Sequence, residues 1–480
     1  MTRQQQLKEI GEMIPENFMS QFIIPFHHHF YDNNASIFAK IDIFDKIEES
    51  GWEIVNKNNT KQIGAFNIKK YIYDNMIPKL DNKNAHLSKN KTVFLRRRID
   101  KQAKISKFSF SITELDLWIF DEHIGFFVLK VSMNDTKYSI NDLSEFNRQM
   151  REFKFLECSE NNDVLTLKKA ANFTEPNDML ECILKYTQID NKSFLNISKD
   201  ECVDSLIYSA STNAKMMTAM QTKTSNFLKD KNNNKPGESI EPLYSSELNS
   251  TKITGTSTLE EIPYYLASCS SLSPSPEWTN NEEYIHSMVD DGGFNIWKYS
   301  SGIILHDSFA LFGLNKDGGP VVSNMKNSFY FIYMLNLYIH FQLRFIAYEI
   351  IDEDFDSLDI SYRYKQLQKL KNQFISKEVG TKFQENEIHK SIRSALSIEE
   401  IVSEVTENLM ETKEITQSHF GIYMTLLGFI VVTLLEVPIK NIIVNHFVAV
   451  IIGASILLVI WLKFKSGIKK TFRRVLAKFY

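Results

Sequence analysis

Two long apolar runs near the C-terminus dominate the hydropathy pattern of the chain. Residues 420–435 and 447–462 contain no charged side chain. A bilayer core takes about 20 mostly apolar residues, and a helix that is apolar on every face is typical of a membrane span or of a buried core. The pattern predicts two membrane helices, with two buried helices of a globular domain as the alternative. Pro438 ends the first helix, because proline lacks an amide hydrogen and clashes with the preceding turn.

Upstream of these runs, strand-like and helix-like patterns alternate. Glu114–Phe120 and Ile124–Met133 are rich in β-branched and aromatic residues and read as a hairpin. A helix follows, with Asn141 or Asp142 as its N-cap. A second hairpin is expected around Asn161. Because strands and helices mix without a regular βαβ rhythm, the pattern predicts an α+β fold with a mixed sheet, followed by a long helical stalk and two C-terminal transmembrane helices.

The changes in pattern divide the chain into successive regions. These are an N-terminal mixed α/β cytoplasmic domain over 1–250, its continuation with strands over 251–325, a helical region and stalk over 326–418, transmembrane helices over 419–440 and 441–463, and a basic cytoplasmic tail over 464–480.

The stalk is predicted to be one long helix. Ser397 and Glu400 fit the S-x-x-E capping box, and the next glycine or proline is Gly421, inside the first apolar run. A helix from Ser397 to Glu436 is roughly 60 Å long. A short coiled-coil seam follows the same helix, which predicts packing against other copies of the chain. The seam consists of Ile398, Val402, Val405 and Leu409.

An acidic stripe follows the stalk at spacings of three and four residues. It consists of Glu400, Glu404, Glu407, Glu411 and Glu414. Three interpretations stay open. The stripe is a solvated face, or it concentrates cations above a pore, or the basic tail folds back onto it.

The first apolar run also carries a stripe of small and hydroxyl residues, which fall within about 140° of one another on a helix. Its members are Gly421, Thr425, Gly428, Val432, Thr433 and Glu436. Such a stripe is typical of close packing between membrane helices. In a ring of subunits the same residues would line a pore, with Glu436 at a cation-selecting mouth.

Charge orients the predicted spans. The tail holds seven basic residues and no acidic one, whereas the turn between the spans holds only Lys440. The positive-inside rule then places both termini in the cytoplasm, and the chain is expected to be a multi-pass protein of the bacterial inner membrane.

Composition narrows the chemistry. The chain has 480 residues, 43% of them hydrophobic, and a net charge of −4, which argues against nucleic acid as a direct partner. The four cysteines form no paired metal spacing. Nucleotide-loop, metalloprotease and serine-hydrolase motifs are missing, so no enzyme is predicted and no catalytic residue is assigned. No metal site is predicted either, because consecutive histidines such as 27–29 point in different directions.

The mixed domain, the stalk, the two spans with a very short turn and the basic tail together resemble the CorA-like metal-ion transporter superfamily. CorA proteins carry Gly-Met-Asn at the end of the first span, and this chain lacks it; "GIYM" at 421–424 lies at the start of the span. The stretches "LDLWIFDEHIGFFVLKVSM", "DLSEFNRQM" and "FYFIYMLNLYIHFQLRF" are similar to divergent CorA-like effectors of type III CRISPR defence.

The resemblance implies a homo-pentameric antiviral channel that permeabilises the membrane and is gated by a nucleotide second messenger, S-adenosylmethionine joined to AMP (SAM-AMP). In the sequence, a basic cluster suits a phosphate, although such a cluster is more often a solvated face. Three further side chains suit stacking on a purine, although tryptophans are more often part of a buried core. The candidates are Arg96, Arg97, Arg98, Trp118, His123 and Trp297.

Three functional hypotheses therefore follow from the sequence. The first is the nucleotide-gated channel. The second is a constitutive divalent-cation (Mg²⁺) transporter of CorA type. The third is a membrane-anchored scaffold or enzyme whose spans serve only as an anchor.

Overall fold

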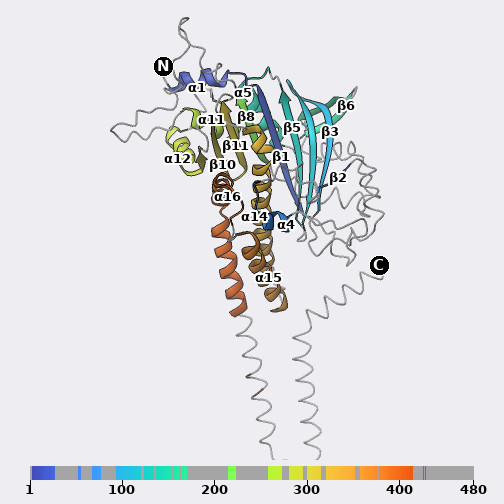
Figure 1. Cartoon of the computed structure of the whole chain (residues 1–480), viewed down its shortest axis with the longest axis vertical. Helices are drawn as coiled ribbons and strands as arrows, with labels where there is room; N and C mark the ends of the chain where they lie inside the picture. The colour runs from blue at the N-terminus through green and yellow to red at the C-terminus, as the bar shows by residue number, and fades with distance from the viewer. Residues whose placement is uncertain are drawn as a thin grey trace, which may run out of the picture. The chain divides into compact units, whose positions relative to one another are not determined.

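The computed structural model describes residues 3–27, 52–55, 67–76, 93–120, 124–134, 137–152, 156–161, 164–169, 214–222, 258–272, 281–295, 300–314, 321–351, 357–375 and 378–414, with 425 and 428 (Figure 1). The chain divides into two compact units. The first, an αβα unit, comprises Met1–Ile339 and Lys377–Ile398; the second, a helical unit, comprises His340–Ser376 and Glu399–Tyr480.

The strands are β1 (Asn17–His27), β2 (Glu53–Ile54), β3 (Val93–Ile105), β4 (Phe108–Ile119), β5 (Ile124–Asn134), β6 (Leu156–Asn161), β7 (Val164–Lys169), β8 (Lys215–Thr222), β9 (Gly293–Phe294), β10 (Ser300–Leu305) and β11 (Ser308–Leu314). The helices are α1 (Arg3–Gly11), α4 (Lys70–Met76), α5 (Ile140–Arg151), α11 (Thr258–Ser268), α12 (Glu282–Gly292), α13 (Val321–Lys326), α14 (Ser328–Ile351), α15 (Ser357–Leu370), the π-helix η5 (Lys371–Ile375) and α16 (Phe383–Ala395).

All described strands belong to one sheet in the order β6-β7-β3-β4-β5-β1-β8-β11-β10-β9, with β2 paired to β3 (Figure 1). The β11–β8 and β3–β7 pairs are parallel, and the others are antiparallel. The predicted β4–β5 and β6–β7 hairpins are confirmed.

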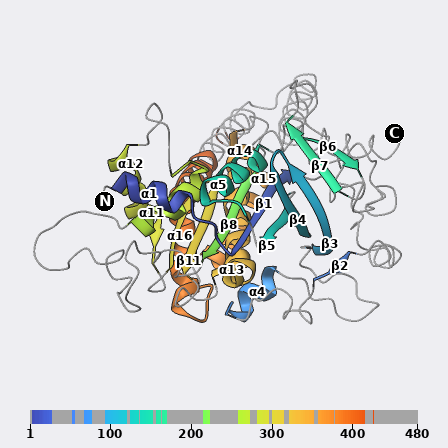
Figure 2. The ribbon, with the colours of Figure 1, turned by 90° about the horizontal axis from the view of Figure 1, so that it is seen from above.

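Helices cover both faces of this sheet. Alternate residues of β1 face opposite ways: Ser20 donates a hydrogen bond to Asn147 of α5, whereas Gln21 donates to the carbonyl of Met325 in α13. In Figure 2, β1 and β8 pass between α5 and α13. A mixed sheet with helices on both faces is an α/β arrangement, which corrects the α+β class predicted from the sequence.

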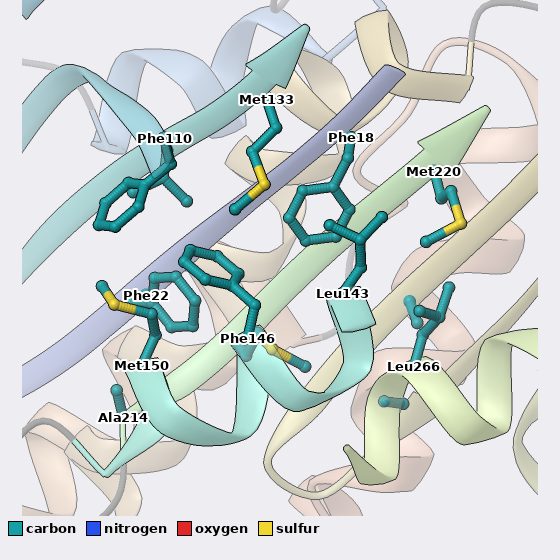
Figure 3. Close-up of a cluster of buried hydrophobic side chains, with 14 of the residues drawn as sticks. Phe18, Phe22, Phe110, Met133, Leu143, Phe146, Met150, Ala214, Met220 and Leu266 are labelled. Carbon is teal, nitrogen blue, oxygen red and sulfur yellow. The ribbon is translucent and has the colours of Figure 1, made fainter. Parts of the chain in front are cut away.

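The larger core lies on the α5 face, where Phe146 occupies its centre (Figure 3). Its ring meets those of Phe18, Phe22, Phe108 and Phe110 at centroid distances of 5.0 to 6.3 Å, all nearly edge-to-face. Such aromatic pairs add about 0.5–1.5 kcal/mol each to the free energy of area burial.

A capping box fixes the start of α5. The Ser139 side chain accepts from the Asp142 amide, and the Asp142 carboxylate accepts from the Ser139 amide. The N-cap is therefore Ser139, and the sequence prediction of Asn141 or Asp142 was wrong by two or three residues.

The other face of the sheet packs against α14. Phe120 stacks on Tyr338 at 4.3 Å, and Phe309 lies 6.0 Å from the ring of Tyr333. Every residue from Phe329 to Ile339 is at most 7% exposed, so the aromatic pattern of this helix marks a core.

The helical unit contains the second half of α14, α15 with η5, and the helix over 399–414. The Arg363 guanidinium of α15 lies 5.5 Å from the ring of Phe345, and the Lys413 ammonium lies 6.0 Å from that of Tyr364. These contacts join all three helices within this unit.

The predicted membrane architecture is contradicted. Within the described ranges, no helix is both long enough and apolar enough to cross a bilayer. The predicted spans, 419–440 and 441–463, lie outside those ranges except for Thr425 and Gly428. The two-span fold class and the multi-pass inner-membrane localisation are therefore withdrawn.

The helix α14 is an example of an apolar helix that is buried in protein. This helix has 24 residues and is mostly apolar, yet its first half is buried in protein rather than in lipid. A protein core and a bilayer are both apolar, so hydropathy alone does not separate a buried helix from a span.

Candidate functional site

The structure describes four of the six residues predicted to bind a ligand, and these four do not form an open site. Arg96 and Trp118 are brought together on the α14 face, but both are buried. Arg97 is half-buried, and burial lowers the pKa of its guanidinium. Arg98 is exposed and lies 4.0 Å from the Glu114 carboxylate. The remaining two, at positions 123 and 297, are outside the described residues.

Arg96 belongs to a buried ionic cluster centred on Asp116, which has no exposed surface. The guanidinium donates from Nε to Oδ1 at 2.8 Å and from Nη2 to Oδ2 at 2.9 Å, a bidentate pair. The Lys130 ammonium lies 2.7 Å from Asp116 Oδ2 and donates to Glu114 at 3.1 Å. Two cations thus meet two carboxylates across β3, β4 and β5.

A hydrogen-bond chain links this cluster to α14. The Tyr330 hydroxyl donates to Asp116 Oδ2 at 2.7 Å and accepts from Trp118 Nε1 at 2.9 Å. The Lys130 ammonium lies 4.5 Å from the centroid of the Tyr330 ring. Trp118 also stacks on Phe94 at 3.8 Å. This packing leaves no opening for a purine beside Trp118.

Burial lowers the pKa of Lys130, and the Asp116 carboxylate opposes that effect. Burial raises the pKa of Asp116, but Arg96 and Lys130 outweigh burial and hold that pKa well below its ordinary value. Burial, together with the Asp116 carboxylate, raises the pKa of Tyr330 well above its ordinary value, so its hydroxyl keeps its proton. A charge-balanced, water-excluded cluster of this kind fixes the position of α14 on the sheet.

Unlike the buried ionic cluster, the acidic stripe is exposed. All five of its glutamates are exposed on the helix over 399–414, and within the described ranges none forms an ion pair. The stripe consists of Glu400, Glu404, Glu407, Glu411 and Glu414. The part of the chain that the structure describes contains no group of three or more His, Cys, Asp or Glu side chains able to hold a metal ion.

An open groove of about 890 Å³ runs beside this stripe within the helical unit. Its lining combines acidic, small and apolar side chains with a single cation from η5. The lining residues are Lys371, Glu399, Val402, Ser403, Thr406, Glu407, Met410, Glu411 and Glu414. Met410 is 49% exposed. The groove therefore offers both charge and apolar surface.

The predicted seam is buried within a single chain. Ile398, Val405 and Leu409 are at most 1% exposed, and Val402 is half-buried in the groove. Ile398, Val405 and Leu409 already have partners in their own chain, so these three side chains are not available for packing against other copies. Self-association stays a prediction that needs another surface.

Of the residues predicted to line a pore, Thr425 and Gly428 are described, and both are exposed. The other four, Gly421, Val432, Thr433 and Glu436, lie outside the described residues.

Sequence reasoning missed Asp116, Lys130 and Tyr330, as well as Met410 and Lys371 in the groove. One sign of the cluster was present: Asp116 alternates with Glu114 and Trp118 in the predicted strand, so a charge shares a face with a core aromatic. The sequence contained no comparable sign of Lys371, because its partner helix is 28 residues or more away.

No family model, curated protein or solved structure matches the chain. The CorA-like resemblance and the nucleotide ligand that it implies therefore stay predictions.

Proposed function

We propose that the chain is a non-catalytic binding protein whose helical unit recognises a basic, amphipathic helical segment of a partner protein. The observation that carries the proposal is the groove, where Glu407, Glu411 and Glu414 form no ion pair with any described residue and lie beside the exposed side chain of Met410.

Repulsion within the acidic stripe lowers the stability of the free protein. Like charges at i,i+3 and i,i+4 destabilise a helix by about 0.2–0.5 kcal/mol per pair, and the stripe contains four such successive pairs. Docked lysine or arginine side chains would remove this repulsion. Charge complementarity therefore favours a basic occupant over a neutral or acidic one.

The apolar side of the groove supplies the remaining affinity. Val402, Thr406 and Met410 recur every four residues and so form one line along the helix. Methionine adapts its shape to different partners. A partner helix with apolar residues on one face and lysines beside them would cover both the line and the carboxylates.

The test is the binding of a labelled amphipathic lysine–leucine peptide to the full chain, followed by fluorescence anisotropy. Changing Glu407→Lys with Glu411→Lys reverses two groove charges and should weaken binding at least tenfold, which is about 1.4 kcal/mol. Changing Glu400→Lys with Glu404→Lys is the matched control. It makes the same charge change on the same stripe, but neither residue lines the groove, so a smaller loss is expected.

Equal losses in the two double variants would show non-specific charge attraction and overturn the proposal. The same assay tests the tail as an occupant. If a chain ending before Lys463 binds the peptide more tightly than the full chain, the tail competes for the groove. If the affinity is unchanged, the tail does not occupy the groove and a partner protein is its ligand.

A further inference from the structure

The helices α16 and 398–414 are separated by a break of only two residues. Leu396 and Ser397 leave the helical conformation, and Ser397 has a φ of 51°, in the left-handed region. Helices that end in this way usually carry glycine at this position, because a Cβ strains the left-handed conformation. Ser397 is exposed.

The capping box of Ser397 and Glu400 favours a helix start here, but an N-cap residue normally has an extended backbone, whereas that of Ser397 is left-handed. Residues 381–420 contain neither glycine nor proline to end the first helix. The break therefore depends on the packing of α16 in the αβα unit, where Ile388, Ile392 and Leu396 have no exposed surface.

The packing of α16 also buries polar groups whose hydrogen bonds are incomplete. Asn336 Nδ2 donates to the Ile332 carbonyl at 2.7 Å and faces His389 Nδ1 at 2.9 Å, so His389 Nδ1 is the acceptor and Nε2 carries the proton. His389 Nε2, Asn336 Oδ1 and Glu385 Oε2 are nevertheless buried, and none of them has a hydrogen-bond partner among the residues that the structure describes. Each such group opposes burial of the helix that carries it.

We propose that residues 383–414 form a two-state switch, broken at Ser397 when α16 is packed and continuous through Ser397 when α16 is released. The strained Ser397 and the three buried polar atoms both oppose the broken state, whereas the apolar residues of α16 favour it. Because the groove lies on the second helix, the switch would couple the packing of α16 to the segment that carries the groove.

The test measures the distance between spin labels at the exposed positions Lys390 and Glu404, in the full chain with its native cysteines changed to serine. In a continuous helix these positions are about 21 Å apart along the axis. Ser397→Ala should increase the population near this distance and Ser397→Gly should decrease it, with the ratio of the two states differing on the order of tenfold between the variants.

Ser403 provides the matched control, because it is an exposed serine in regular helix. Ser403→Ala and Ser403→Gly affect both states equally and should leave the ratio unchanged. A second route changes Asn336→Leu together with His389→Leu, which removes two unpartnered groups and should deplete the continuous state. If the distance is the same in the Ser397→Ala, Ser397→Gly and double-leucine proteins, the break is fixed and there is no switch.

Discussion

Asp116 is the residue on which the position of α14 against the sheet depends most. Its carboxylate receives two hydrogen bonds from Arg96, one from Tyr330 and an ion pair from Lys130, all away from water. Ion pairs of this kind add little net stability compared with apolar packing, but removing one partner is costly because the others stay buried without a counter-charge.

Changing Asp116→Asn should therefore destabilise the chain by about 3–5 kcal/mol. The loss would appear as a lower midpoint of urea unfolding followed by circular dichroism. Glu114→Gln is the control, because this carboxylate lies beside the same cations but its side chain is 27% exposed; its expected cost is below about 1 kcal/mol. Similar costs for the two variants would contradict the central role of Asp116.

The burial of His389 predicts that the stability of the folded chain depends on pH. Burial, followed by the charge of Arg393, lowers its pKa from 6.5 to about 3. The unfolded chain therefore binds a proton at this residue at a higher pH than the folded chain does. The stability associated with neutral His389 is complete above pH 6.5 and is lost as the pH falls from 6.5 towards 3.

In urea unfolding at pH 8, 6, 5 and 4, the difference in stability between the native chain and His389→Leu should shift steadily in favour of the variant as the pH falls. A constant difference across this range would mean that the pKa of His389 is the same in the folded and the unfolded chain.

Among the elements, the helix over 398–414 differs most from its sequence prediction. The seam residues were expected to face other copies, but Val405 and Leu409 are buried inside one chain. A heptad pattern identifies an apolar face and not the helix that covers it. Here the covering helices come from residues far upstream, and periodicity carries no information about them.

Changing Val405→Asp with Leu409→Asp should destabilise the helical unit rather than separate copies of the chain. Burying two unpaired charges costs several kcal/mol, so the helical unit should unfold at a lower temperature. Thermal melts and light scattering distinguish the two accounts. A change in mass with an unchanged melting temperature would restore the seam as an interface between copies.

For the molecule as a whole, local patterns predicted much of the sheet. The β4–β5 and β6–β7 hairpins and α14 follow from alternation, helical spacing and turn residues. The order of the strands did not follow, because β1 pairs with β5 and β8 across gaps of about a hundred residues or more. The members of the ionic cluster lie on β3, β4, β5 and α14. They are distant in sequence and come together only in the fold, so the sequence did not predict the cluster.

The groove was predicted only in part from the sequence. Its acidic side was visible as a stripe, whereas its apolar line and Lys371 became visible only in the folded helical unit. Our central claim is that this groove binds a basic helix.

Hydrogen exchange of the full chain, measured by mass spectrometry with and without the amphipathic lysine–leucine peptide, tests that claim most directly. The peptide should slow exchange within 399–414 and in the η5 segment, and the Glu407→Lys, Glu411→Lys chain should lose this protection. Protection that appears elsewhere, or that survives the two charge reversals, would contradict the account.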